Sequence, residues 1–359
     1  MTRGRGRRAR LGGALDRAGV LDRLLWLRAR LGRRELAVIT FHRVGRADDA
    51  GELDPHLFEV EPEELEAELA VLRDHCTVVS ITDVRRFAKG KRLPPSPVLV
   101  TFDDGYVDGH DAALPILRRA GVPATFFIPT AFPDAGRLFW WDRVWLTMRR
   151  CPLDRALLGY PSVIELHPRA APGASAKLVC HAIKRTPGID LARLWEDLER
   201  ATGVSISAEE ERSIARRTIL GMRQIRALRD AGMDVQSHSH EHLVLNTLTP
   251  EAAARDLSRS AEALREAVGG EVFSVAYPVG YALPAALRRA PEAARFELGF
   301  TNGTGKGRDR FDPLDIPRLS MDLEFTLAEL KLLLLFGSAA RPSLSLLPAA
   351  PDAAEGAGG

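Results

Sequence analysis

Hydrophobic and polar positions follow two alternating rhythms along the first third of the chain. Short apolar runs rich in β-branched and aromatic residues predict buried strands, and leucines spaced three or four apart predict helices between them. The predicted strands are 36–41, 78–81, 98–102 and 124–128, and the predicted helices are 61–74, a piece that starts at 83, and 112–120. Because strands and helices alternate, we expect an α/β fold with parallel strands and helices packed outside them.

The rhythm changes between about 133 and 218 and then resumes. This stretch opens with Trp140-Trp141-Asp142-Arg143 and continues in charge-rich helical patterns without a strong strand. It is therefore predicted to be a helical insertion that covers one side of the domain. The tryptophan pair is typical of a core anchor, and stacking on a sugar ring is the alternative. After the insertion the patterns predict helices at 222–231, 250–268 and 327–336 and strands at 233–236, 272–276 and between 300 and 319.

The two ends of the chain differ from this pattern. Five arginines precede a segment from 12 to 34 with Leu21, Leu24 and Leu25 at helical spacing, so 1–34 is predicted to be a basic arm and an amphipathic helix. We expect the apolar face of this helix to pack on the domain, and the arm to be solvated or to contact acidic lipid. Residues 35–340 form the predicted main domain, and the Pro-, Ala-, Ser- and Gly-rich segment 341–359 is predicted to be disordered.

Composition excludes several classes of protein. With 45% hydrophobic and 27% charged residues the chain is globular, and a formal net charge of +2 argues against a nucleic-acid partner. The three scattered cysteines, Cys76, Cys151 and Cys180, indicate neither a disulfide framework nor a cysteine zinc site. Because no secretion signal or apolar run of about 18 residues is visible, we expect a cytoplasmic location, with peripheral contact to the inner face of the membrane as an option.

Two adjacent carboxylates end the strand 98–102. Asp103 and Asp104 follow Phe102 directly and precede Gly105. Neighbouring carboxylates repel, and burial beside an apolar strand adds desolvation, so such a pair persists most easily where a cation or a reaction uses the charge. An ordinary turn that closes the strand is the alternative.

Two histidines follow the strand 233–236 in the same way. His238 and His242 lie four residues apart, a spacing that lets two imidazoles reach one metal ion. If both strands belong to one parallel barrel, the histidines and the aspartates meet at its carboxyl edge. Two ring nitrogens and one carboxylate then leave a position open for water, as a catalytic zinc requires. Taken alone, each histidine could be a surface or capping residue, and His42, which follows the strand 36–41, could line the same edge or be structural.

Three motifs together resemble a known family. Thr101-Phe102-Asp103-Asp104-Gly105, His238-Ser239-x-x-His242 and Tyr277-Pro278-Val279-Gly280 resemble the first three motifs of the polysaccharide deacetylases with a NodB-type domain, family 4 of the carbohydrate esterases. The resemblance runs from about 36 to 334 apart from the insertion, and it implies a distorted (β/α) barrel. It also implies that Asp104, His238 and His242 bind a divalent metal, most simply Zn²⁺, and that Asp103 is the catalytic base.

The resemblance further implies a substrate and its contacts. A backbone N–H near Tyr106 would hold the oxyanion, and the residues expected to contact substrate are Tyr106, Tyr277, Pro278, Gly280 and Arg318. The implied reaction removes N-acetyl groups from amino sugars of a surface polysaccharide or of its lipid-linked precursor and releases acetate and a free amine. A silent carbohydrate-binding module that keeps the metal site is the alternative, and hydrolysis of a non-sugar amide or imide is a third option.

Two positions depart from the family pattern. Ala276 stands where members often have an arginine, and Arg318 either supplies the missing charge or is a plain surface residue. No histidine follows His242, although the family usually has a late histidine that protonates the leaving amine. Either Asp103 returns the proton itself, which we favour, or His42 or His240 substitutes, or turnover is weak.

Overall fold

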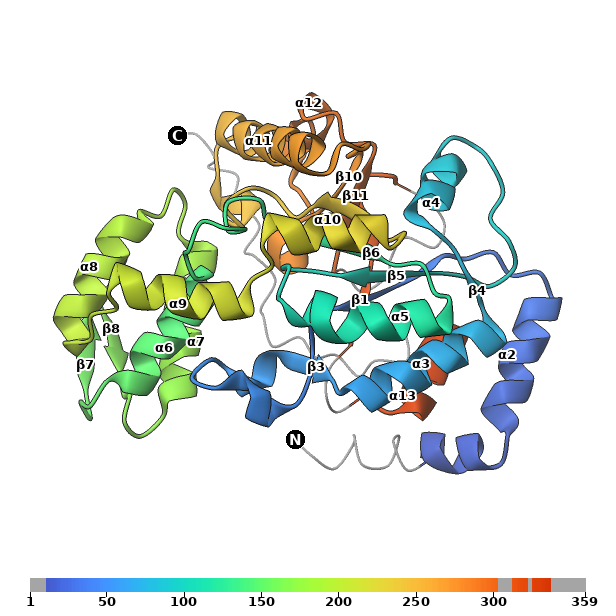
Figure 1. Ribbon diagram of the computed structural model, residues 1–359, viewed down its shortest axis with the longest axis horizontal. Coiled ribbons are helices and arrows are strands. Elements are labelled where there is room, and N and C mark those ends of the chain that lie inside the picture. The colour runs from blue at the N-terminus through green and yellow to red at the C-terminus, as the bar shows by residue number, and fades with distance from the viewer. Residues whose placement is uncertain (1–10, 303–311, 322–324, 337–359) are drawn as a thin grey trace, which may run out of the picture.

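A sheet of parallel strands forms the centre of the molecule (Figure 1). The structure, a computed structural model, describes residues 11–302, 312–321 and 325–336. The neighbouring strands run in the order β12-β11-β10-β9-β6-β5-β1-β13, and β4 also pairs with β5. Their bounds are β1 (Ala37–Phe41), β4 (Thr77–Val78), β5 (Pro97–Phe102), β6 (Thr125–Ile128), β9 (Asp234–Ser237), β10 (Ser274–Ala276), β11 (Leu298–Thr301), β12 (Ile316–Pro317) and β13 (Leu319–Ser320).

The two edges of this sheet belong to one short stretch of chain. β12 pairs with β11, β13 pairs with β1, and Arg318 alone separates β12 from β13. The Arg318 N–H donates to the carbonyl of Thr301 on one side, and the Met321 N–H donates to the carbonyl of Thr40 on the other. With β12 and β13 counted as one strand and β4 left aside, the sheet is a nearly closed barrel of seven parallel strands, which confirms the predicted distorted (β/α) barrel.

Alternate residues of the barrel strands face two different cores, as the pleat of a strand requires. Val38, Leu99 and Phe127 belong to an inner cluster that includes residues of α4, whereas Val100 and Phe126 belong to an outer cluster under the helices. The barrel helices are α3 (Pro62–His75), α4 (Ile81–Ala88), α5 (Leu114–Ala120), α10 (Met222–Asp230), α11 (Pro250–Val268), α12 (Ala290–Ala293) and α13 (Leu327–Phe336). Burial on both faces explains why the central strands are continuously apolar in the sequence.

The predicted strand 78–81 is wrong in its second half. β4 ends at Val78, and Ile81 already opens α4. Ser80 caps this helix: its hydroxyl accepts from the Asp83 N–H, and the Asp83 carboxylate accepts from the Ser80 N–H. The apolar run from Val78 to Ile81 therefore crosses a capping box, which stops the strand and starts the helix.

The region between β6 and α10 forms a separate lobe at the left of Figure 1. It has its own apolar cluster, which includes Val144, Val179 and Leu194. Its elements are α6 (Trp140–Arg150), β7 (Ala156–Leu158), β8 (Ile164–Leu166), α7 (Pro172–Arg185), α8 (Leu191–Thr202) and α9 (Ala208–Thr218). The expectation of a stretch without a strong strand holds, and the structure adds one short antiparallel pair, β7 and β8, whose three-residue strands are too short to give a periodic signal.

The N-terminal helix α2 (Val20–Arg30) packs on the domain with only part of its apolar surface. Leu21 and Leu25 are buried, as expected for the apolar face of this helix, whereas Leu24 is 38% exposed. The predicted basic arm and the predicted disordered tail lie largely outside the described residues. Within the described part of the chain, no helix combines the length and the apolar character needed to cross a bilayer.

Candidate active site

Asp103 and Asp104 stand where β5 ends at the carboxyl edge of the barrel. The Asp103 N–H still donates to the carbonyl of Phe41, as the next rung of the sheet. Asp104 and Gly105 then adopt positive φ angles of 67° and 73°. The left-handed region is tolerated by Asp and readily adopted by Gly, and the resulting bend turns the backbone away from the strand directly after the two carboxylates.

His238 and His242 are positioned by a short loop after β9. The His238 N–H donates to the carbonyl of Ile128, which continues the pairing with β6. The Ser239 N–H donates to the hydroxyl of Ser237 at 3.1 Å, and the His242 N–H donates to the hydroxyl of Ser239 at 3.1 Å. These two serine hydroxyls fold the loop back, so that two histidines four residues apart reach one point.

Three donor atoms from the two strands converge. Asp104 Oδ1 lies 3.3 Å from His238 Nε2 and 3.1 Å from His242 Nε2, and the two Nε2 atoms are 3.2 Å apart. All three residues are buried. Ligands placed 2.0–2.2 Å from a tetrahedral ion lie about 3.3–3.6 Å from one another. The observed separations are within a few tenths of an ångström of that range.

The protonation of this cluster also suits a cation. His238 Nδ1 lies 2.8 Å from the carbonyl of Ala276, so Nδ1 carries a proton and Nε2, the atom that would bind a cation, faces Asp104. Burial tends to raise the pKa of Asp104, but the hydrogen bonds from His238 and His242 outweigh it and hold that pKa well below its usual range. A carboxylate and two imidazoles in this state fit a divalent cation, and the donor set does not select which one.

Asp103 is held beside this cluster by Arg318. The guanidinium donates from Nη1 to Oδ1 at 2.8 Å and from Nη2 to Oδ2 at 2.7 Å, and both side chains are buried. Burial alone would raise the pKa of Asp103, but the charge and the hydrogen bonds of Arg318 lower it. Arg318 sits at the barrel closure between β12 and β13, so the alternative of a plain surface arginine is wrong.

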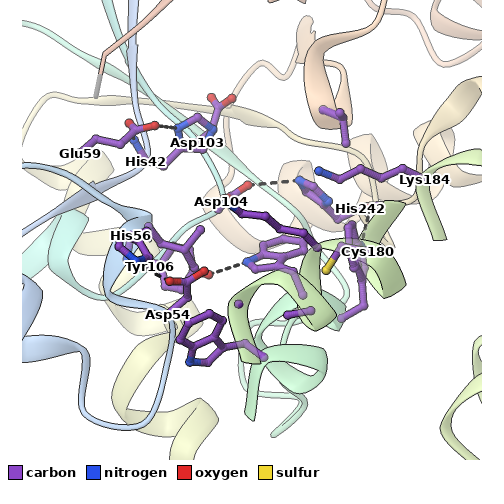
Figure 2. A pocket seen from close by; sticks show the side chains of 18 of the residues that line it. His42, Asp54, His56, Glu59, Asp103, Asp104, Tyr106, Cys180, Lys184 and His242 are labelled. Atoms are coloured by element: carbon purple, nitrogen blue, oxygen red, sulfur yellow. Dashed lines mark hydrogen bonds and ion pairs between the residues drawn. The ribbon is translucent and has the colours of Figure 1, made fainter. Parts of the chain in front are cut away.

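A cavity of about 360 Å³ opens above the cluster, with Asp103, Asp104, His238 and His242 among the residues that line it (Figure 2). His42 lines the same cavity, and its ring donates from Nδ1 to Glu59 at 2.8 Å. Burial opposes a charge on this imidazole, but Glu59, with smaller contributions from Asp104 and Asp103, raises the pKa of His42 to about 10.

The opposite wall of the cavity comes from α6 and α7 of the lobe. Its side chains are aromatic or positively charged, apart from one cysteine: Trp140, Trp141, Trp145, Lys177, Lys184 and Cys180. The centre of the Trp141 ring lies 4.5 Å from that of His242, so the wall reaches the cluster of Asp104, His238 and His242. Sequence reasoning missed both lysines and Glu59, because nothing in their local patterns separates them from ordinary solvated helix or loop positions.

The remaining predicted site residues occupy different places. Tyr106 lines the cavity, but its hydroxyl accepts from Trp141 Nε1 at 2.7 Å and donates to Asp142 at 2.9 Å. Tyr277 donates to the carbonyl of Leu314 and packs in the core, and Pro278 and Gly280 are also buried. Of the third motif, Val279 is the residue that lines the cavity. His240 bonds Thr130 and is not among the cavity residues.

The sequence matches a family profile described as polysaccharide deacetylase. The match covers residues 90–151 and 200–296, which include both aspartates and both histidines and leave out much of the lobe. A comparison with curated proteins finds no match.

Solved structures show the same fold at low sequence identity. IcaB from Ammonifex degensii is 16% identical, with a TM-score of 0.54 over 85% of this chain and 98% of that chain. The deacetylase PplD of Streptococcus pyogenes, in complex with acetate, is 14% identical, with a TM-score of 0.52 over 82% of this chain and 96% of that chain. BC0361, a polysaccharide deacetylase from Bacillus cereus, is 16% identical, with a TM-score of 0.52 over 83% and 68% of the two chains.

Proposed function

Because the chain belongs to the polysaccharide deacetylase family, we propose that it is a metal-dependent hydrolase that removes N-acetyl groups from amino sugars of a surface polysaccharide or of its precursor. The observation that carries the proposal is the meeting of Asp104, His238 and His242 within 3.3 Å of one another on the floor of a cavity, beside a separately held Asp103. A structural ion would not need an open cavity or a neighbouring carboxylate outside its ligand set.

Asp104, His238 and His242 would hold the divalent cation, and two imidazoles with one carboxylate suit Zn²⁺. When bound, the cation supplies Lewis-acid chemistry: it polarises the acetamide carbonyl and makes a water molecule more acidic. The protein must then remove a proton from that water and stabilise the negative charge that develops on the carbonyl oxygen.

Asp103 is the proposed general base. Its bidentate contact with Arg318 keeps it ionised and fixes its orientation, and each oxygen retains a lone pair for the proton of the attacking water. Tyr106 pairs with Ile219 in an isolated antiparallel bridge, in which the Val107 N–H donates to the carbonyl of Thr218 and the Leu220 N–H to that of Gly105. The backbone N–H of Tyr106 itself donates to no acceptor among the described residues. That free donor beside the carboxylates suits the developing oxyanion.

His42 is the proposed donor of the proton to the leaving amine. Of the three alternatives that the sequence leaves open, it is the residue that both lines the cavity and carries a proton at neutral pH, because Glu59 raises its pKa to about 10. Its Nδ1 is engaged by Glu59, which leaves Nε2–H as the donor. A His42→Gln variant should lose about 10²-fold in kcat. A substrate whose leaving amine carries an electron-withdrawing fluoro or nitro group should restore most of the loss, because a less basic amine needs less protonation to leave. An unchanged kcat would return the role to Asp103.

The test of the proposed function is acetate release from an N-acetylglucosamine oligomer by the purified full-length protein. We expect release, its loss after treatment with a chelator, and its recovery when Zn²⁺ is added back. Oligomer binding without release under metal-loaded conditions would instead indicate a silent binding module. Release that a chelator does not change would contradict a metal-dependent reaction.

A further inference from the structure

The outer face of α2 carries large apolar side chains that the domain does not cover. Only Leu21 and Leu25 of this helix are buried. The exposed ones are Leu24 at 38%, Trp26 at 54%, Leu27 at 46% and, at the C-cap, Leu31 at 68%. Single exposed leucines need no explanation, but four large apolar residues exposed within eight positions of one helix mark an interaction surface.

Arginines lie among these apolar residues. Arg23 and Arg30 are exposed on the same helix, and the Arg30 guanidinium lies 4.3 Å from the centre of the Trp26 ring. The first 34 residues hold 11 of the 50 basic and 2 of the 48 acidic residues, a formal charge of +9 in a chain whose total is +2. Both acids of this segment, Asp16 and Asp22, are paired with Lys331, so they do not neutralise the arginines.

The helix is fixed with this face outward. Arg28 donates to the carbonyl of Leu334 at 2.9 Å, and Lys331 of α13 lies 2.7 Å from Asp22. These contacts tie α2 to α13 on its inner side, so this face is preorganised for a flat partner.

We propose that α2 docks this protein on an anionic membrane surface, with Leu24, Trp26, Leu27 and Leu31 in the interface and the arginines on lipid phosphates. Large apolar side chains beside positive charges, on a helix that lies flat, are the combination that binds anionic bilayers. A second copy of the chain is a poorer occupant, since it would bring two strongly positive segments together. Nucleic acid would use the arginines but would leave four apolar side chains in water.

Docking through α2 also sets where the cavity lies. In Figure 1, α2 and the lobe of α6–α9 stand at opposite ends of the long axis, and the lobe provides one wall of the cavity. A chain bound through α2 therefore presents the cavity away from the bilayer, where it meets a glycan that extends from the membrane.

The test is co-sedimentation of the full-length protein with phosphatidylcholine vesicles, with and without phosphatidylglycerol. We expect binding that requires phosphatidylglycerol and weakens with salt. A Leu24→Glu/Trp26→Glu/Leu27→Glu variant should bind these vesicles at least about 10-fold more weakly than wild type. The matched control is Leu157→Glu/Val163→Glu in the β7–β8 hairpin, which removes comparably exposed apolar side chains (51% and 79%) and should bind as the wild type does.

Three results would overturn the proposal. They are equal vesicle binding by the triple variant, equal binding to vesicles without anionic lipid, and a wild-type dimer that the triple variant breaks while neither binds vesicles. Melting temperatures within about 3 °C of wild type would show that the variants fold, since surface changes cost little. Acetate release from a soluble oligomer should be unchanged in the triple variant, so membrane docking and the hydrolase function fail independently.

Discussion

The floor and the lobe wall of the cavity are built in opposite ways. On the floor, Asp103, Asp104 and His238 are almost completely buried, and each has a specific partner at hydrogen-bond distance. On the wall from α6 and α7, Trp140 and Trp145 are buried, but Lys177 is exposed and Lys184 is half-buried, and neither lysine forms an ion pair among the described residues. The floor can therefore hold reacting groups to within fractions of an ångström, whereas the wall can adapt to what enters.

The difference suggests a division of labour. Groups that are buried and fully paired have shifted pKa values and fixed orientations, which bond-making steps require. The aromatic and cationic side chains of the wall offer stacking and positive charge to a sugar chain without fixing one geometry. Changes on the floor should therefore alter turnover, and changes on the wall should alter affinity.

The largest effect is expected for Asp103→Asn. This change keeps the shape of the side chain and removes the base, so kcat for acetate release should fall about 10³-fold or more. The metal content should not change, because Asp104, His238 and His242 are untouched. Asp111→Asn is the control: it removes the charge of an exposed aspartate that contacts His110 and does not line the cavity, so it should leave kcat unchanged. Full activity of Asp103→Asn would refute the assigned base.

Arg318→Met should come next. It leaves Asp103 buried without its counter-charge, which typically costs about 3–5 kcal/mol in the free energy of unfolding. Urea unfolding measures this loss, and kcat should fall with it because the base is no longer held in place. Arg288→Met, which removes an exposed arginine from its pair with Asp312, should change stability by less than about 1 kcal/mol. A stable Arg318→Met variant with normal kcat would show that the pair serves neither purpose.

Glu68, a buried acid that does not line the cavity, differs from Asp103 and Asp104 because it has no counter-charge in the part of the chain that the structure describes. Glu68 of α3 is 4% exposed, and burial, with the charges of Glu64 and Glu59, raises its pKa from 4.5 to about 8. The folded state thus binds a proton that the unfolded chain has released above pH 4.5, so this contribution to stability is complete below pH 4.5 and is lost as the pH rises through about 8.

The Glu68→Gln variant should therefore be more stable than wild type at pH 8.5, by about 2–4 kcal/mol, and the two should converge near pH 5. Thermal or urea unfolding across this pH range is the measurement. Glu66→Gln on the same helix removes an exposed carboxylate and is the control, with a pH dependence like that of wild type. Parallel curves for wild type and Glu68→Gln would mean that Glu68 does not titrate in this range.

The smallest effect is expected on the wall. Lys184→Ala removes a positive charge from the cavity, 5.8 Å from the centre of the Trp140 ring, and should raise KM for the oligomer about 3- to 10-fold with kcat nearly unchanged. Lys91→Ala, an exposed lysine that does not line the cavity, should change neither constant. A large fall in kcat for Lys184→Ala would end the division of labour between floor and wall.

The sequence predicted the floor better than the wall, for a physical reason. The barrel strands are continuous apolar runs, and the acids and histidines stand directly at their ends, so local pattern and topology together bring Asp104 to His238 and His242. Lys184, Trp145 and Glu59 reach the cavity only through the packing of α7, α6 and β3 (Phe58–Val60) on the barrel, and no local pattern encodes that packing. Arg318 lay between these cases, since its residue type fitted the role but the barrel closure that buries it involves strands of two residues.

The most direct test of the account is titration of Zn²⁺ into the metal-free full-length protein, followed by calorimetry. We predict one ion per chain, and binding weaker by about 10²-fold or more in His238→Ala. His181→Ala, which removes an exposed histidine of α7, should bind as wild type does. Absence of stoichiometric binding by wild type, or equal affinity in His238→Ala, would contradict a metal centre at Asp104, His238 and His242.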